Sequence, residues 1–378
     1  MTLRMKSTKI KILQTIRQGK IGGGETHVLD LVSNLDKNLF ECIVLSFTYG
    51  PMVDKLKGMG IKTYVIETEM PFNFLKWKAV EKLMLSEQID VVHAHGSRAN
   101  SNVFYAAKAL NIPLIYTVHG WSFHPDQSPM VKKFRILSEK FLVKKADLTI
   151  CVSQSNLEDG KKLFPMPKAK VIKCGINFSK FDLNGIYDDV RSGLSIGTDT
   201  ILVGYVVRMT KQKDPLTLIN AIALIAPEKD IKFLLVGDGE LKEEAIALVD
   251  KLGLSAKVIF LDFTENVPAV LNALDIYCLP SLWEGLPLGM LEAMAMKTAV
   301  IVSSIDGAIE VINDRENGLL VEPKNINQLA NAISTLADDP HLRSRLATNG
   351  YNTVVKDFDI SKMINAISNT YTAIINKS

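Results

Sequence analysis

The sequence predicts an α/β fold built from two doubly wound, Rossmann-like domains, and three observations lead to this prediction. The chain has 378 residues, of which 47% are hydrophobic and 22% charged, and this length exceeds the size at which one core usually keeps growing. Short β-rich runs alternate with helical patterns through the whole chain, as in parallel sheets with crossover helices. This alternation breaks once, from Ser179 to Thr200, where the sequence is polar and contains glycine, as a linker does.

The first half of the chain alternates strand and helix patterns, and we expect it to form a domain spanning residues 1–180. Its expected strands lie at 9–16, 40–47, 62–67, 89–95, 113–120, 148–153 and 170–176. Apolar residues recur at helical spacing between them, at 25–35, 78–87, 100–110 and 130–146.

The second half starts the same pattern afresh, and we expect a domain spanning 199–357 that faces the first. Its expected strands lie at 201–208, 231–239, 257–263, 275–281, 298–304 and 318–322. A C-terminal helix at about 358–378 is expected to cross back to the first domain. In open α/β sheets, ligands bind beyond the carboxyl ends of the strands, so functional residues should follow strands.

Composition excludes several classes of function. A net charge of +3 is too small to indicate a nucleic-acid partner. The four cysteines are widely spaced without a CxxC pair, which indicates neither a zinc site nor a disulfide framework and fits a reducing cytoplasm. Charged residues interrupt the N-terminal segment, which argues against a secretory signal, and no apolar run approaches the ~18 residues of a membrane span.

Three consecutive glycines, Gly22 to Gly24, connect the first expected strand to the first expected helix. The dinucleotide motif G-x-G-x-x-G fails because His27 stands where its third glycine would be, and the Walker motif is absent. Glycine amides at a helix N-terminus can still be approached by a phosphate. A tight strand-to-helix turn without a ligand is the equally weighted alternative.

The segment from Leu279 to Thr298 carries two glutamates, Glu284 before an expected helix and Glu292 about two turns into it. Pro287 suits the start of that helix because it has no N–H to leave unsatisfied. Two carboxylates with helix-terminal amides between them suit a ligand that has hydroxyls at both ends and phosphates in the middle. On its own, this segment would equally fit a surface helix with ordinary glutamates.

A basic pair opens the second domain. Arg208 ends an expected strand, and Lys213 follows it five residues later. Together these cations can neutralise a diphosphate, Arg208 through its planar fork and Lys213 as a compact charge. A solvated loop is the alternative, and it fits the neighbouring Lys211 better than Arg208.

Taken jointly, these motifs resemble those of retaining glycosyltransferases of family 4, which have the GT-B fold. The resemblance covers nearly the whole chain. It rests on the glycine-rich first loop, the Arg-x4-Lys pair, the E-x7-E element, the VHG turn at His119 and the VGDG turn at Gly237. Two positions depart from the family pattern: CGIN stands for Asn-Gly-Val-Asp, with Cys174 and Asn177 in the outer places, and Asp262 stands for a glycine.

The resemblance implies that the chain binds a nucleotide-sugar donor, for which UDP is the expected nucleotide. Arg208 and Lys213 would hold the diphosphate, Glu284 the sugar hydroxyls and Glu292 the ribose hydroxyls, while His119 would face the sugar. The remaining implied donor-binding residues are Gly23, Gly24, Gly237, Asp238, Leu286, Pro287, Leu288 and Gly289. Pro287 itself has no N–H to donate, and the base would lie near Gly237, Asp238 and residues 263–267.

No metal and no cofactor are expected for the transfer. The only Asp-x-Asp triplet, at residues 357–359, does not follow an expected strand, so we interpret it as chance. The resemblance implies front-face attack with retention of configuration, in which the leaving phosphate helps to deprotonate the acceptor.

The acceptor side is expected to bind a glycan, which the resemblance to polysaccharide-assembly enzymes suggests is polyprenyl-linked. Candidate residues are His95, Arg98 and Trp121. The segment 132–146 interleaves basic and apolar residues, so it can lie on an anionic bilayer or pack on the core with a solvated basic face. The expected location is the cytoplasm, including the inner face of the cell membrane.

Two other functions stay open from the sequence. A GT-B sugar-nucleotide epimerase would share the donor motifs and need no acceptor. A two-domain sugar-binding protein of the periplasmic type would share the paired α/β pattern, but it should carry an export signal and lack the clustered Arg208, Lys213, Glu284 and Glu292.

Overall fold

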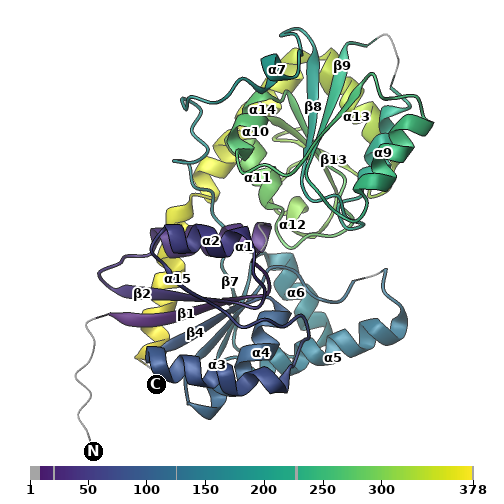
Figure 1. The fold of residues 1–378 in the computed structure, drawn as a ribbon. Helices are drawn as coiled ribbons and strands as arrows, with labels where there is room; N and C mark the ends of the chain where they lie inside the picture. The colour runs from purple at the N-terminus through teal and green to yellow at the C-terminus, as the bar shows by residue number, and fades with distance from the viewer. Residues whose placement is uncertain (1–8, 20–21, 125, 226–228, 377–378) are drawn as a thin grey trace, which may run out of the picture. The chain divides into compact units, whose positions relative to one another are not determined.

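The structure is a computed structural model that describes residues 9–19, 22–124, 126–225 and 229–376. The chain forms two compact units (Figure 1). Unit 1 comprises the described residues up to Cys174 together with those from Ser361 onward, and unit 2 comprises the described residues of Gly175–Ile360.

Unit 1 is built on a parallel sheet of seven strands in the order β3-β2-β1-β4-β5-β6-β7. The strands are β1 (Ile10–Ile16), β2 (Phe40–Ser46), β3 (Lys62–Val65), β4 (Val91–His95), β5 (Leu114–Val118), β6 (Leu148–Cys151) and β7 (Ala169–Val171). The helices are α1 (Gly23–Asn34), α2 (Pro51–Gly58), α3 (Phe74–Glu87), α4 (Ser97–Ala109), α5 (Pro129–Lys145), α6 (Gln154–Leu163) and α15 (Ile360–Ile375). The strand and helix patterns of the first half are therefore confirmed.

Both faces of this sheet are apolar and covered by helices. Side chains alternate along a strand, so Ile43 and Leu45 of β2 join the core beneath α3 and α4, whereas Val44 joins the core beneath α1 and α2. Figure 1 shows α1 and α2 on one side of the strands and α3 and α4 on the other.

Helix α15 packs on unit 1 through a buried tyrosine. The hydroxyl of Tyr371 accepts from Nε2 of Gln14 at 2.8 Å and lies 2.6 Å from Nδ1 of His93. All three side chains are fully buried. The C-terminal helix is thus tied by hydrogen bonds to β1 and β4.

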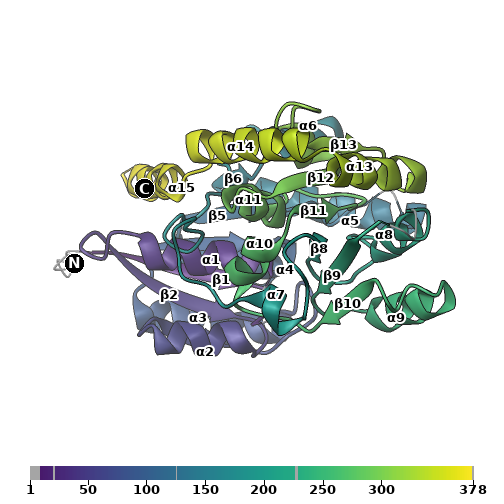
Figure 2. The same cartoon turned by 90° about the horizontal axis from the view of Figure 1, so that it is seen from above.

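Unit 2 has a parallel sheet of six strands in the order β10-β9-β8-β11-β12-β13. The strands are β8 (Ile201–Val206), β9 (Ile231–Val236), β10 (Val258–Leu261), β11 (Ile276–Leu279), β12 (Ala299–Ser303) and β13 (Leu319–Val321). The helices are α7 (Val190–Gly193), α8 (Pro215–Ile222), α9 (Lys242–Lys251), α10 (Val267–Ala273), α11 (Leu288–Ala295), α12 (Asp306–Ile309), α13 (Ile326–Asp338) and α14 (Pro340–Asp357). Figure 2 shows α13 and α14 side by side.

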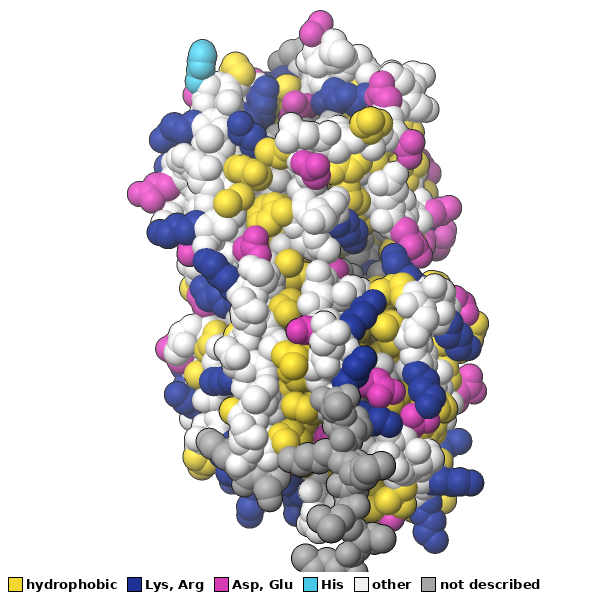
Figure 3. Space-filling model, turned by 90° about the vertical axis from the view of Figure 1, so that its left-hand side faces the viewer, with side chains coloured by type: hydrophobic (Ala, Val, Ile, Leu, Met, Phe, Trp, Pro, Cys, Tyr) yellow, Lys and Arg dark blue, Asp and Glu magenta, His cyan; other side chains and the backbone are white. Residues whose placement is uncertain are grey.

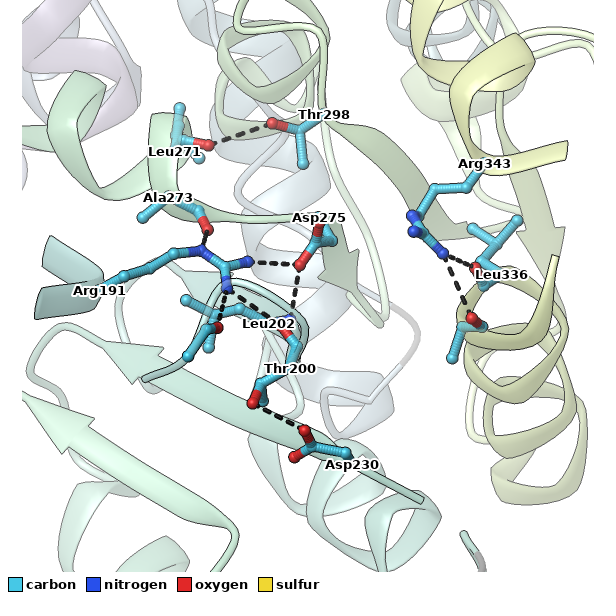
Figure 4. Close-up of polar contacts among 12 residues, drawn as sticks. Arg191, Thr200, Leu202, Asp230, Leu271, Ala273, Asp275, Thr298, Leu336 and Arg343 are labelled. Carbon is cyan, nitrogen blue, oxygen red and sulfur yellow. Dashed lines mark hydrogen bonds and ion pairs between the residues drawn. The ribbon is translucent and has the colours of Figure 1, made fainter. Parts of the chain in front are cut away.

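The polar segment that the sequence places between the domains belongs to unit 2. Arg191 of α7 donates to the carbonyl groups of Ala273, Gly197 and Thr200 at 2.8–3.0 Å and forms an ion pair with Asp275 (Figure 4). The first boundary accordingly falls at Cys174–Gly175 rather than near residue 180. Polar composition alone does not separate a linker from a segment whose arginine satisfies loop carbonyls.

Charges of both signs are interspersed over the surface, as Figure 3 shows for one face. This distribution agrees with the net charge of +3. In the described part of the chain, no helix is both long and apolar enough to cross a membrane.

Candidate donor-binding and active site

In each sheet the strand order reverses direction at one point, between β1 and β4 in unit 1 and between β8 and β11 in unit 2. Ligands of open α/β sheets bind beside such a switch point, outside the carboxyl ends of the strands. Arg208 follows β8 and Glu284 follows β11, so both lie beyond the two strands that flank the switch point of unit 2.

Glu284 is the centre of a buried polar network. The side chain is 9% exposed, forms an ion pair with Lys213, and accepts from Oγ of Ser281 at 2.8 Å. Nε2 of Gln212 donates to its second oxygen at 3.3 Å. The structure therefore brings Glu284 and Lys213 together as partners, which fixes the ammonium group in place.

Arg208 has no such partner. It is exposed, and among the described residues its guanidinium forms neither a hydrogen bond nor an ion pair. The loop that carries Arg208 requires glycine at position 237, because a Cβ there, where φ is +132°, would lie 2.3 Å from the carbonyl oxygen of Val207. The structure thus places at the switch point a cation that no described side chain compensates.

Helix α11 begins where the sequence predicts. Pro287 is its N-cap, and the first hydrogen bonds run from the amides of Met290 and Leu291 to the carbonyl of Pro287. The amides of Leu288 and Gly289 precede the first intrahelical bonds, so they can bind an anion. Glu292 lies on this helix and is partly buried.

Tyr277 of β11 lies beneath the start of α11. Burial raises its pKa well above the usual range, and the carboxylates of Glu292 and Glu284 raise it further. A Cβ at Gly289 would lie 2.5 Å from the Tyr277 hydroxyl. This close approach is the reason that position 289 requires glycine.

Asp238, the candidate for the base side, is an exposed residue in a charge cluster. It forms an ion pair of 2.7 Å with Lys242 and accepts from the amide of Phe263 at 3.2 Å. Asp262, which departs from the family pattern, also pairs with Lys242. The structure brings Asp238 next to the 263–267 segment, as the expected base site requires.

In unit 1 the glycine-rich turn meets the VHG turn. Gly23 and Gly24 form the first turn of α1, and a Cβ at Gly24 would lie 3.6 Å from Cδ2 of His119. Burial lowers the pKa of His119 to about 4, so its imidazole is neutral at physiological pH. Its Nε2 lies 3.1 Å from Nδ1 of His95.

Two of the three candidate acceptor residues are buried. His95 is 2% exposed and bonds His119 and Gln14, so it orients His119 and presents no open surface. Trp121 is 6% exposed, and its indole N–H donates to the carbonyl of Asn156 at 2.7 Å, which places it in the core.

Arg98, the third candidate, is only partly buried at the start of α4. Burial lowers its pKa, and so do the charges of Arg17 and Arg135, while Glu69 opposes the effect. Among the described residues none of the three guanidinium groups forms a hydrogen bond or ion pair. Sequence reasoning missed Arg17 and Arg135, since only the adjacency of β1 and β4 and the packing of α5 on α4 bring them near Arg98.

Comparisons with known proteins agree with this geometry. Residues 21–180 match the model of the family described as Glycosyltransferase Family 4, and residues 187–353 match that described as Glycosyl transferases group 1. One relative is UDP-Gal:alpha-D-GlcNAc-diphosphoundecaprenol alpha-1,3-galactosyltransferase of Escherichia coli. Its sequence is 28% identical to this chain, and the match covers 97% of this chain and 98% of the relative.

A second relative comes from Campylobacter jejuni. It is N-acetylgalactosamine-N,N'-diacetylbacillosaminyl-diphospho-undecaprenol 4-alpha-N-acetylgalactosaminyltransferase, which is 33% identical over 63% of this chain and 65% of its own length.

Solved structures share the fold. Anabaena HepE, solved in complex with UDP-glucose, matches 96% of this chain and 100% of its own with a TM-score of 0.86 and 24% identity. WaaG, a glycosyltransferase involved in lipopolysaccharide biosynthesis, matches 96% of this chain and 99% of its own with a TM-score of 0.76 and 15% identity. The two family matches follow one another along nearly the whole chain, and the paired sheets are those of GT-B enzymes: the chain belongs to glycosyltransferase family 4.

Proposed function

We propose that this glycosyltransferase moves a sugar from a UDP-sugar to a polyprenyl-diphosphate-linked glycan in cell-surface polysaccharide assembly, with retention of configuration and without a metal ion. The observation that carries the proposal is the exposed guanidinium of Arg208, which has no partner among the described residues and lies at the same switch point as the Lys213–Glu284 pair. The names of the relatives from Escherichia coli and Campylobacter jejuni support the choice of donor and acceptor.

The chemistry follows from charge. As the bond between the anomeric carbon and the phosphate oxygen breaks, negative charge grows on the diphosphate, and Arg208, Lys213 and the amides of Leu288 and Gly289 stabilise it. The acceptor hydroxyl oxygen attacks the same face of the anomeric carbon and passes its proton to the leaving phosphate oxygen. Neutral His119 contributes a hydrogen bond to the sugar and no charge.

The acceptor proposal rests on Arg98, Arg17 and Arg135. Burial and the charges of Arg17 and Arg135 lower the pKa of Arg98, so the three guanidinium groups lie near one another. None of them has a partner among the described residues, and they suit a ligand with two phosphates because arginine binds phosphate oxygens bidentately. We assign them to the diphosphate of the lipid-linked acceptor.

Helix α5 is the proposed contact with the membrane. Its inner face buries Glu139, Leu142 and Val143. Its outer face exposes an apolar stripe at helical spacing, formed by Met130, Phe134, Leu137 and Phe141. Lysines at 132, 133, 144 and 145 flank the stripe, so the helix suits an anionic bilayer at its inner leaflet.

The proposed function is tested by a screen of nucleotide sugars with and without a polyprenyl-diphosphate-linked monosaccharide. We expect UDP release that depends on the acceptor, together with a lipid product that is one sugar larger. Release without acceptor, with a free or epimerised sugar, would instead identify an epimerase. Sugar-nucleotide binding without any turnover would identify a binding protein.

A further inference from the structure

Three side chains from distant parts of the sequence converge in unit 1. His27 lies on α1, His119 follows β5, and Cys174 follows β7. Each can offer one ligand atom, and these three atoms all lie within 4.8 Å of one another. His27 and Cys174 are each 4% exposed, whereas His119 is only partly buried.

His27 differs from the nearby His93 in its hydrogen bonding within the described part of the chain. Both of its ring nitrogens are buried and, in the described part of the chain, have no hydrogen-bond partner. His93, by contrast, uses one nitrogen toward Tyr371 and the other toward Thr117, at 2.6 and 2.7 Å. An unsatisfied buried polar group costs about 1–3 kcal/mol, so the two nitrogens of His27 are available to a ligand that the described residues do not provide.

The neutral form of the His27 imidazole is the form that binds a metal ion. Burial, followed by the charges of His119 and His93, lowers the pKa of His27 well below its usual range, so its imidazole is neutral. Burial raises the pKa of the Cys174 thiol to about 12, so an ion must displace the thiol proton before the sulfur can bind it, which lowers the affinity at neutral pH. Cys174 also occupies the place where the family pattern has asparagine, which makes this group a feature of the present chain.

We propose that His27, His119 and Cys174 bind a single Zn²⁺ ion, with a water molecule as the fourth ligand. Two imidazole nitrogens and one thiolate are the donor set that Zn²⁺ prefers. Tetrahedral Zn²⁺ with bonds of about 2.0–2.3 Å holds its ligand atoms roughly 3.3–3.7 Å apart. The three ligand atoms, which lie within 4.8 Å of one another, would therefore move together by about one ångström when the ion binds.

The ion has no part in the transfer chemistry proposed above. Because His119 is assigned to the donor sugar, an ion that binds it would withdraw it from that role and inhibit transfer. This regulatory consequence rests on the proposed function, whereas the binding site itself does not.

The test uses Co²⁺ as a spectroscopic probe of the full-length protein after chelation, without donor or acceptor. We expect one Co²⁺ per chain, with a near-ultraviolet thiolate-to-cobalt charge-transfer band and the intense visible bands of a tetrahedral ion, both displaced by Zn²⁺. Cys174→Ser should abolish the charge-transfer band, and His27→Gln should weaken binding at least tenfold. The matched controls Cys151→Ser and His124→Gln should leave the spectrum unchanged.

Absence of the charge-transfer band in the wild type, or its persistence in Cys174→Ser, would overturn the proposal. Circular dichroism of each variant establishes that the fold is intact. A positive binding result with no glycosyl transfer would refute the proposed function alone, and transfer without Co²⁺ binding would refute this site alone.

Discussion

In the candidate site of unit 2, Lys213 and Arg208 differ in whether a carboxylate already pairs with them. Lys213 already has an anionic partner in Glu284, so part of its charge is compensated before any donor arrives. Arg208 has none among the described residues, so its full charge would be available to the diphosphate that we propose it binds. We infer that Arg208 supplies most of the counter-charge and that Lys213 is a positioned second cation.

Replacing Arg208 with alanine is expected to reduce kcat/KM at least tenfold, a loss of about 1.4 kcal/mol in transition-state stabilisation. Lys211→Ala removes an exposed cation from the same loop and is the matched control, with an expected change below twofold. Steady-state rates of UDP release measure both variants. Equal rates for Arg208→Ala and Lys211→Ala would contradict the role of Arg208.

The two glutamates are expected to differ in what they bind. Ribose hydroxyls are the same in the ground and transition states, so Glu292→Gln should raise KM for the donor and weaken UDP binding. Glu284→Gln should lower kcat severalfold without weakening UDP binding, since it frees Lys213 from its ion pair. Calorimetric titration measures the affinity of each variant for UDP. Weaker UDP binding in Glu284→Gln would refute the assignment of Glu284 to the sugar.

Sequence spacing predicts the members of this site but not their pairing. Arg208, Lys213 and Glu284 could be placed after strands because parallel strands end at one edge of a sheet. The Lys213–Glu284 contact joins residues 71 positions apart and depends on β8 and β11 being neighbours. The resemblance to polysaccharide-assembly enzymes makes Trp121 a candidate acceptor residue, but only the structure shows that its indole N–H donates to a carbonyl of α6 inside the core.

At the scale of elements, α5 carries two apolar faces with different neighbours. The face with Leu142 and Val143 belongs to the hydrophobic core of unit 1, and the stripe with Phe134 and Leu137 is exposed. Helical periodicity in the sequence predicts this helix but cannot assign its faces, because both stripes are apolar and the lysines lie between them. Only packing against α4 identifies the inner face.

The double variant Phe134→Glu with Leu137→Glu is expected to abolish sedimentation with vesicles of phosphatidylglycerol and phosphatidylcholine. Replacing the lysines at 132, 133, 144 and 145 with glutamate should do the same, since each lysine contributes about 1 kcal/mol at an anionic surface. Leu224→Glu, at an exposed apolar position of unit 2, is the control that should still sediment. If both α5 variants bind the vesicles as the wild type does, the exposed stripe does not contact the membrane.

At the scale of the whole molecule, buried neutral histidines should make unit 1 sensitive to acid. Burial lowers the pKa of His93 to about 3, with a further contribution from the charge of His119, and burial lowers that of His119 to about 4. Both lie near 6.5 in the unfolded chain. Below pH 6.5 the unfolded chain therefore binds more protons than the folded one, so stability falls as pH falls toward 4.

The free energy of unfolding of unit 1 is thus expected to fall by about 1 kcal/mol or more between pH 7 and pH 5. Urea unfolding can be followed by tryptophan fluorescence in a Trp283→Phe variant, whose remaining tryptophans, Trp77 and Trp121, both lie in unit 1. A His93→Gln variant should show a shallower dependence on pH. An unfolding midpoint that does not change between pH 7 and pH 5 would contradict the buried neutral state.

The overall architecture was the most predictable part, since alternating patterns in both halves predict two parallel sheets. The boundary between the two units was less predictable. The polar composition of residues 179–200 does not reveal that Arg191 joins this segment to unit 2 through a hydrogen bond to Ala273 and an ion pair with Asp275. The convergence of His27 with Cys174 was also hidden, because residues so far apart in the sequence meet only through the order of the strands.

The central claim is that protein charges, without a divalent cation, stabilise the leaving diphosphate. Its most direct test is the initial rate of transfer from a UDP-sugar to a polyprenyl-diphosphate-linked sugar in excess EDTA, for the wild type and Arg208→Ala. We predict that the wild type keeps its full rate, or gains where a bound ion is removed, and that Arg208→Ala is at least tenfold slower with or without EDTA. Loss of wild-type activity in EDTA, restored by Mg²⁺ or Mn²⁺, would contradict the account.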